Sequence, residues 1–152
     1  MKVLVTGGAG FIGAAVCVRL LERGDAVVCV DSLNDAYDVR LKEWRLARLT
    51  GREGFRFVRA DVADEASVRA VFEEERRDGG IDAVVNLAAR AGIRPSVEIP
   101  RAYYETNVLG TITLLEACRA FGVPRFVLAS SSSVYGDATR VPFREVDPPG
   151  RL

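Results

Sequence analysis

Short apolar stretches alternate with longer amphipathic segments along most of the chain. The apolar stretches span residues 3–6, 26–30, 55–59, 83–87 and 125–130, and most of them have no polar alternation. Parallel strands that are covered by helices on both faces have this composition, so we expect five strands of a parallel sheet. The intervening segments predict helices over residues 11–23, part of 34–50, 64–77 and 100–120. The pattern therefore predicts a doubly wound α/β domain over residues 1–136.

Local signals mark the ends of the predicted helices. Asp64 has the side chain of an N-cap, and Pro100 suits the first turn of a helix. Glycines close three helices, at Gly24, at 79–80 and at Gly122. Within the first helix, one group of apolar residues is expected to face the core: Ile12, Ala15, Val16, Val18 and Leu20.

Composition narrows the possible functions. The 152 residues suit one globular domain, and the 21 basic and 21 acidic residues cancel, which argues against a nucleic-acid or anionic-membrane partner. The absence of histidine excludes His-based metal sites and Ser-His-Asp catalysis, so no metal site is predicted. No apolar run approaches 18 residues, and the chain enters a strand directly, so we expect a cytoplasmic protein. The three cysteines are interpreted as small core residues: Cys17, Cys29 and Cys118.

A glycine-rich turn joins the first strand to the first helix. Its glycines are Gly7, Gly10 and Gly13, within the run TGGAGFIG. We assign the first to a tight turn, the second to close approach of a pyrophosphate, and the third to close helix–strand packing. The amino end of the helix would offer free N–H groups to the phosphates. A tight βα turn without a ligand remains the alternative, and the acid that ends the second strand favours binding.

Two acidic residues follow the next two strands. Asp31 lies 18 residues after Gly13, close to the spacing of the carboxylate that binds adenosine ribose hydroxyls. Such a carboxylate would repel a 2′-phosphate, which favours NAD over NADP; an ordinary turn residue is the alternative. Asp61 and Val62 end the third strand, where they could bind adenine. Helix capping is the other interpretation of Asp61.

Small and polar residues follow the fourth and fifth strands. Asn86 to Ala89 would allow close approach of a nicotinamide-side ribose. Ser130 to Ser133 lies where doubly wound folds bind ligands, and without a neighbouring base these hydroxyls suit orientation of a substrate; a polar turn is the alternative. Asn107 lies inside the last helix. We interpret it as a residue that forms hydrogen bonds with a neighbouring loop, or else as an ordinary solvent-facing residue.

Together these motifs resemble the extended short-chain dehydrogenase/reductase family, the NAD-dependent epimerase/dehydratase group. The matching pieces run in order from TGGAGFIG through Asp31, Asp61-Val62, NLAA, YETNVLGT and SSSSVYG. Residues 31–47 and 89–96 look most like UDP-glucuronate 4-epimerases. Those enzymes oxidise C4 of a UDP-sugar with tightly held NAD and return the hydride to the other face.

The resemblance implies a role for each matching residue. NAD would be bound by Gly7, Gly10, Phe11, Ile12, Gly13, Asp31, Asp61, Val62, Leu87, Ala88, Ala89 and Asn107. Ser131 matches the catalytic Ser/Thr that hydrogen-bonds the sugar C4 oxygen. Substrate contacts would come from Arg94, Ser96, Ser132 and Ser133. The full-length enzyme would take a UDP-sugar as its partner and would form a homodimer.

The sequence departs from the family at the general base. The family uses a Tyr-x-x-x-Lys motif, and no tyrosine of this chain has a lysine four residues later. Residues 137–152 are interpreted as a tail that leads toward this motif, with the carboxyl-terminal sugar-nucleotide domain absent. We therefore expect the cofactor half of a 4-epimerase that is inactive by itself. The alternatives are a dehydratase or decarboxylase of the same group, and a freestanding dinucleotide-binding module.

Overall fold

The computed structural model describes residues 1–137 and 141–147, and it contains one five-stranded sheet. The strands stand in the order β3-β2-β1-β4-β5, and each neighbouring pair is parallel. Their bounds are β1 Lys2–Thr6, β2 Ala26–Asp31, β3 Phe55–Arg59, β4 Ala83–Asn86 and β5 Phe126–Leu128. The predicted doubly wound α/β fold is confirmed. The predicted fifth strand was too long, because β5 ends two residues before Ser130.

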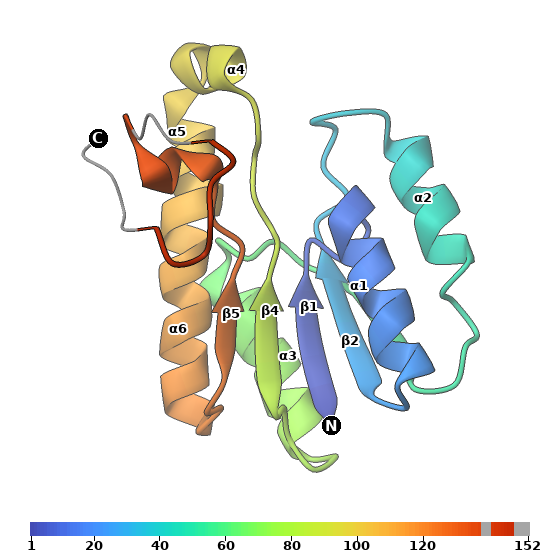
Figure 1. The fold of residues 1–152 in the computed structure, drawn as a ribbon. Coiled ribbons are helices and arrows are strands. Elements are labelled where there is room, and N and C mark those ends of the chain that lie inside the picture. The colour runs from blue at the N-terminus through green and yellow to red at the C-terminus, as the bar shows by residue number, and fades with distance from the viewer. Residues whose placement is uncertain (138–140, 148–152) are drawn as a thin grey trace.

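Helices cover both faces of the sheet. α1 and α2 pack on one face, with α1 in front of the sheet in Figure 1 and α2 to its right, and α3 and α6 pack on the other face. The bounds are α1 Phe11–Glu22, α2 Val39–Ala47, α3 Glu65–Arg76, α4 Ile93–Glu98, α5 Pro100–Tyr103 and α6 Gly110–Phe121. A π-helical segment, η1 (Tyr104–Leu109), joins α5 to α6, so the predicted helix over 100–120 is continuous but widened in its first half. The short helix α4 was not predicted.

Alternate strand residues form two separate cores. Leu4, Val28 and Val84 point toward α3 and α6, where the rings of Phe72 and Phe121 lie 5.5 Å apart. The intervening strand residues, with Val5 among them, pack under α1 and α2. Both faces of the central strands are therefore buried, which explains why these strands carry almost no polar side chains.

The buried face of α1 differs from the prediction. Ile12 is 62% exposed and Ala15 is also exposed, whereas Gly13, Ala14 and Cys17 are buried. The helix turns its smallest residues toward the glycine-rich loop and the sheet, because only small side chains leave room for such close packing. Larger apolar residues flank this line and are partly buried: Val16, Val18, Leu20 and Leu21. All three cysteines are buried, as expected.

The predicted helix ends are largely confirmed. The Asp64 carboxylate accepts a hydrogen bond from the Ala66 N–H at 3.2 Å, and Pro100 stands in the first turn of α5. Gly122 ends α6 in the left-handed conformation, at φ 71°. Within the described part of the chain, no helix is both long enough and apolar enough to cross a membrane.

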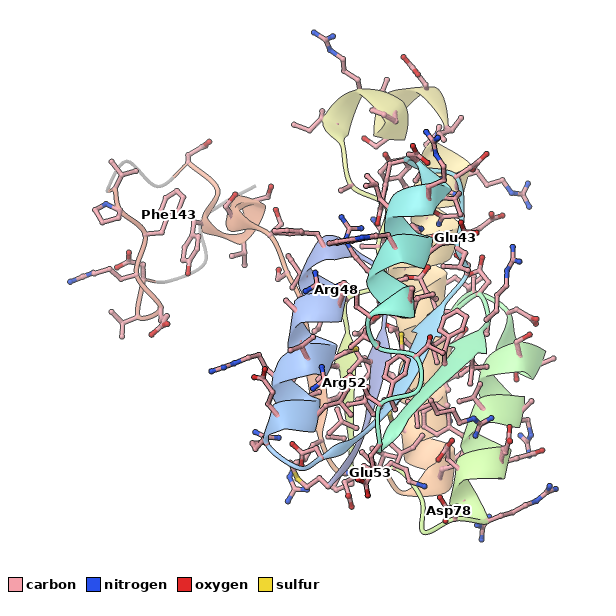
Figure 2. All side chains as sticks on the ribbon, turned by 90° about the vertical axis from the view of Figure 1, so that its right-hand side faces the viewer. Glu43, Arg48, Arg52, Glu53, Asp78 and Phe143 are labelled. Carbon is pink, nitrogen blue, oxygen red and sulfur yellow. The ribbon has the colours of Figure 1, made fainter. Side chains whose placement is uncertain are left out.

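The carboxyl ends of the strands share one edge of the sheet, at the arrowheads in Figure 1. The strand order reverses between β1 and β4, and the connections from these two strands leave in opposite directions. Doubly wound folds bind ligands in the crevice outside such a reversal. Beyond β5 the chain forms a 3-10 turn, η2 (Ser132–Tyr135), and the segment that carries Phe143 stands away from the sheet in Figure 2. Of the predicted tail, residues 138–140 and 148–152 lie outside the described residues.

Candidate cofactor-binding site

A pocket lies at the carboxyl ends of β1, β2, β3 and β4. Segments far apart in the sequence line it: the glycine-rich loop, the chain after β2, the end of β3 and the loop after β4. Eight predicted cofactor residues line this pocket: Gly7, Gly10, Asp31, Asp61, Val62, Leu87, Ala88 and Ala89. The fold thus brings together residues that the sequence spreads over more than eighty positions.

Gly7 allows the turn after β1 to pass under the β4 loop. Its φ is +64°, and a Cβ there would lie 2.8 Å from the backbone of Leu87 and Ala88. Any other residue would have to move that loop, so the tight turn predicted for Gly7 is confirmed. The turn is closed by a hydrogen bond from the Gly10 N–H to the Gly7 carbonyl, at 2.9 Å.

Gly13 supports the same turn from the helix side. A Cβ on Gly13 would lie 2.2 Å from the Gly7 carbonyl oxygen. The prediction placed this glycine against a strand, but it packs against the glycine-rich loop itself and does not line the pocket. Its contribution to a ligand site is therefore indirect, through the shape of the turn.

Gly8 lies against Cys29 of β2, a contact that the sequence did not reveal. A Cβ there would lie 2.4 Å from the Cys29 Sγ atom, so the loop can rest on β2 only without a side chain. The hydrogen bond with Cys17, together with burial, raises the pKa of the Cys29 thiol above its ordinary value. Cys29 therefore acts as a neutral packing residue under the loop.

The amino end of α1 opens toward the pocket. Gly10 is the N-cap, and no side chain caps the helix or places an acid in its first turn. The first N–H groups of a helix lack partners within the helix and carry the positive end of its dipole. This end of α1 therefore has the chemistry of a phosphate site, next to Gly10, which lines the pocket without a side chain.

Asp31 is the acid at the end of β2, and it is 7% exposed. Its Oδ2 accepts the Ala9 N–H at 3.1 Å, and its Oδ1 accepts the Leu33 N–H at 2.8 Å. The first bond ties the carboxylate to the glycine-rich loop. The second belongs to a turn that holds Leu33 at a φ of 53°, an uncommon conformation for a leucine. Asp31 is therefore both a turn residue and a wall of the pocket.

Lys42 brings a positive charge to the same wall, which the sequence did not predict. Its ammonium lies 3.6 Å from the Asp31 Oδ1 and donates a hydrogen bond to the Asn34 Oδ1 at 3.0 Å. The residue lies on α2 and is 5% exposed. Asp31 is therefore paired with a buried cation.

Asp61 and Val62 form the β3 side of the pocket. The Asp61 carboxylate accepts the Ala63 N–H at 2.9 Å in a local turn, while the cap of α3 is Asp64. Helix capping is therefore not the role of Asp61. Val62 is 4% exposed and packs against Gly110 of α6. Because the Asp61 side chain is exposed at the pocket edge, its second oxygen can accept a hydrogen bond from a ligand.

A buried polar network joins β1 to β4 behind the pocket. The Thr6 hydroxyl donates to the Asn86 Oδ1 at 2.6 Å and accepts the N–H groups of Leu87 and Ala88, both at 3.2 Å. Asn86 also donates to the Thr111 hydroxyl at 3.2 Å. These bonds position the start of the 87–91 loop, and they satisfy polar groups that burial would otherwise make costly.

Asn107 holds the far end of that loop. Its amide accepts the Arg90 N–H at 2.8 Å and donates to the Arg90 carbonyl at 3.0 Å. The predicted bond to a neighbouring loop is confirmed, but the pocket is lined by the adjacent Thr106 rather than by Asn107. Arg90 itself lines the pocket, and its Nε is buried without a hydrogen-bond partner among the described residues.

The serine run lies apart from this pocket. Ser131 caps η2, where its hydroxyl accepts the Ser133 N–H at 3.2 Å and donates to the Ser133 hydroxyl at 3.2 Å. Ser131, Ser132 and Ser133 are all exposed, and none lines the pocket. The hydroxyls therefore occupy a polar turn after β5, and their predicted substrate roles stay predictions.

Four further predicted residues lie outside the pocket. Arg94 is exposed and Ser96 is partly buried on α4, where the Ser96 hydroxyl donates to the Ile93 carbonyl at 2.6 Å. Phe11 and Ile12 face outward from the first turn of α1, at 81% and 62% exposed, and line a groove along that helix instead. The Gly10–Gly13 turn directs their backbone toward the loop and their side chains away from it.

The residues that the sequence did not indicate share one property. Lys42 and Tyr37 reach the pocket from α2 and the segment before it, and Thr106 reaches it from η1. These segments have ordinary helical or polar patterns, so no local signal distinguishes a pocket residue from a surface residue. Asp31 and Lys42 come together only when α2 folds back toward the end of β2.

The arrangement suits an extended ligand with a central diphosphate. The glycine-rich loop and the amino end of α1 can accept phosphates, and the Asp31 carboxylate can accept sugar hydroxyls. Asp61 and Val62 flank one side of the pocket, while Ala88 and Ala89 offer small side chains on the other. Fold and site together define a dinucleotide-binding protein of the Rossmann class.

Comparison with known proteins assigns the family. The family described as GDP-mannose 4,6 dehydratase matches residues 4–150. The chain therefore belongs to this family, which lies within the NAD-dependent epimerase/dehydratase group that the motifs predicted.

Relatives with 4-epimerase names cover almost the whole chain. A UDP-glucuronate 4-epimerase of Thermodesulfobacterium geofontis is 49% identical over 93% of this chain and 42% of its own length. A UDP-glucose 4-epimerase of Klebsiella pneumoniae is 41% identical over 95% of this chain and 99% of its own length. The crystal structure of a UDP-glucose 4-epimerase from Stenotrophomonas maltophila with bound NAD superposes with a TM-score of 0.82. It is 39% identical over 100% of this chain and 43% of that one. The chain thus spans less than half the length of most of these relatives.

Proposed function

We propose that residues 1–152 form the NAD-binding part of a nucleotide-sugar 4-epimerase. The observation that carries the proposal is the joining of the glycine-rich loop and Asp31 in one pocket, with the Asp31 carboxylate bonded to the Ala9 N–H at 3.1 Å. The adenosine ribose would meet Asp31, the pyrophosphate would meet the amino end of α1, and adenine would lie by Asp61 and Val62. When bound, NAD would supply the hydride acceptor for oxidation at C4 of the sugar.

The bound cofactor would fit the residues present. Gly7 and Gly10 both line the pocket without a side chain, and the first N–H groups of α1 have no side-chain cap. The loop after β4, held by Thr6 and Asn107, would bring Ala88 and Ala89 against the nicotinamide side. Related epimerases have crystal structures with NAD bound, which supports NAD as the cofactor.

UDP-glucuronate is the substrate that we propose for the whole enzyme. Support comes from residues 31–47 and 89–96, which resemble UDP-glucuronate 4-epimerases, and from several relatives of that name. UDP-glucose is the second candidate, because other relatives of similar identity are named UDP-glucose 4-epimerases. In the whole enzyme, the Ser131 hydroxyl would form a hydrogen bond with the sugar C4 oxygen. The homodimer and the cytoplasmic location stay predictions.

The proposal is tested by titrating NAD into the chain in a calorimeter. Gly10→Ala adds a methyl group at the pocket, 3.0 Å from the Gly7 oxygen, and we expect it to weaken NAD binding at least tenfold. Ala15→Val enlarges an exposed residue one turn further along α1 and should leave the affinity unchanged. Equal loss in both variants, or no effect of Gly10→Ala, would contradict the proposed phosphate site.

A further inference from the structure

Lys42 is an unusual residue to find buried on α2. A lysine ammonium is costly to bury unless it is paired and hydrogen-bonded. Here the ammonium lies 3.6 Å from the Asp31 Oδ1, donates to the Asn34 Oδ1 at 3.0 Å and lies 5.0 Å from the centre of the Tyr37 ring. All three partners line the pocket, as Lys42 does. The cation is therefore built into the wall at which we place the adenosine ribose.

The pairing changes the electrostatic role of Asp31. A lone carboxylate at the end of β2 would repel a 2′-phosphate by its charge. With Lys42 at 3.6 Å, the pair carries no net charge, so repulsion from this wall is weaker than the sequence suggested. Asp31 remains the acceptor for ribose hydroxyls, because a carboxylate can accept about four hydrogen bonds and two backbone N–H groups use only part of that capacity.

The ammonium is also close to the place that a 2′-phosphate would take. A hydroxyl bonded to Asp31 lies about 3 Å from one of its oxygens. Lys42 lies 3.6 Å from Oδ1, so the ammonium and a hydroxyl on that oxygen are within roughly 7 Å of each other. A phosphate extends beyond the hydroxyl that it replaces, and a lysine on a flexible stem can follow it as a point charge.

We propose that Lys42 determines cofactor choice together with Asp31. With Asp31 charged, the ammonium is held by the carboxylate, and the pocket takes a ribose with free hydroxyls. Without that charge, Lys42 becomes the cation that binds a 2′-phosphate, so a single substitution at Asp31 turns the pocket toward NADP. This inference rests on the proposed NAD site, and it adds the residue that sets the cofactor's identity.

Two other cations lie near this wall and must be separated from Lys42. Arg59 donates to the Ser32 carbonyl at 3.4 Å, and Arg45 donates to the Ala9 carbonyl at 3.4 Å and to the Tyr37 hydroxyl at 3.0 Å. Both guanidinium groups have backbone partners of their own, and neither forms an ion pair with Asp31. Lys42 is the cation that loses its ionic partner when Asp31 becomes neutral.

The test compares NAD and NADP binding to four proteins by calorimetry. Asp31→Asn removes the charge but keeps an oxygen to accept the Leu33 or Ala9 N–H, and Asp31→Ser is the second version if the first does not fold. Lys42→Met keeps the length of the side chain in the double variant Asp31→Asn/Lys42→Met. Asp31→Asn/Arg40→Met is the matched control, because Arg40 is an exposed cation on the same helix, paired with Asp38. Circular dichroism verifies that each protein is folded.

We expect the wild type to bind NAD more tightly than NADP, and Asp31→Asn to bind NADP at least tenfold more tightly than the wild type does. The double variant with Lys42→Met should return to within about threefold of the wild-type NADP affinity, while the Arg40→Met control keeps the gain. A gain that survives Lys42→Met would assign the phosphate to another cation, such as Arg45, Arg59 or Arg90, and would overturn the inference. The absence of any gain in the folded Asp31 variant would overturn it as well. A wild type that binds neither dinucleotide would instead overturn the proposed function itself.

Discussion

Two glycines show how single positions decide the shape of the pocket. A Cβ on Gly13 would lie 2.2 Å from the Gly7 carbonyl oxygen, which is backbone and cannot turn away. A Cβ on Gly110 would lie 2.6 Å from a Val62 methyl group, which belongs to a side chain that can adjust. Both glycines are helical, so alanine would gain about 1 kcal/mol in helix propensity at either position.

The two alanine variants should therefore differ in their free energy of unfolding. We expect Gly13→Ala to lower the free energy of unfolding by about 1–3 kcal/mol, because overpacking against backbone exceeds the propensity gain. Gly110→Ala should cost less, since Val62 can change its rotamer. Urea denaturation followed by circular dichroism measures both. Equal stability of Gly13→Ala and the wild type would show that the turn can move aside.

Asp25 is the residue at which we expect acid sensitivity. Its carboxylate accepts the Met1 ammonium at 2.9 Å and the Arg23 Nε at 2.5 Å, and these bonds lower its pKa below the ordinary value of 3.8. A group whose pKa is lower in the folded state stabilises the fold above its unfolded pKa, and this contribution is lost as the pH falls through the folded pKa. The loss should therefore begin near about pH 4 and continue below it.

Urea midpoints between about pH 3 and pH 7 test this expectation. Asp25→Asn should lower the midpoint at neutral pH and flatten part of the fall at acid pH. Asp38, Asp64 and Asp78 also have lowered pKa values, from hydrogen bonds to Arg40, Ser67 and Lys2 respectively, so some acid dependence should remain in the variant. An unchanged pH profile in Asp25→Asn would contradict the assignment.

At the scale of the elements, the β4 loop depends on its anchor in η1. Asn107 binds both the N–H and the carbonyl of Arg90, at 2.8 and 3.0 Å. Asn107→Ala would leave these two part-buried groups without partners, at a cost of about 2 kcal/mol. Amide hydrogen exchange should then become faster in residues 88–92 and stay unchanged in β1. Ser96→Ala, which removes one local bond on exposed α4, is the control and should leave the loop protected.

Elements with strong patterns could be predicted from the sequence, and those set by packing could not. The five strands were predicted because burial on both faces requires unbroken apolar runs, and Asp64 was predicted as a cap from its side chain alone. The buried face of α1 was predicted wrongly. Gly13, Ala14 and Cys17 are buried because the helix backbone lies close to the glycine-rich loop and the sheet, and not because they are the most hydrophobic residues of the helix. The π-helical segment η1 and the short helix α4 leave no periodic signal.

The residues of the candidate site also fall into a group that could be predicted from the sequence and a group that could not. The glycine-rich loop, Asp31 and Asp61 were predictable because each occupies a fixed place after a strand. Lys42 and Thr106 were not, because they reach the pocket from helices whose orientation depends on tertiary packing. Ser131, Arg94 and Ser96 carry predictions that came from family resemblance, and in this structure they lie outside the pocket.

In the molecule as a whole, the residues that we propose for NAD line one pocket, whereas the serines predicted for catalysis do not line it. No tyrosine of this sequence has a lysine four residues later, and the serine run lies apart from the pocket. We therefore expect the 152-residue chain to convert no UDP-glucuronate to UDP-galacturonate, even with NAD present. Chromatographic separation of the two sugar nucleotides after prolonged incubation is the measurement. Turnover that grows with protein concentration would contradict this expectation.

NAD should bind at the pocket that the glycine-rich loop and Asp31 share, and the position of binding can be measured residue by residue. Amide chemical shifts of the labelled chain, recorded by NMR during an NAD titration, report which residues meet the cofactor. We predict that the shifts which change lie in residues 7–13, 31–34, 61–62 and 87–91, around one pocket. Changes confined to the outer groove of α1, around Ala15, Arg19 and Arg23, or no changes at all, would contradict the account.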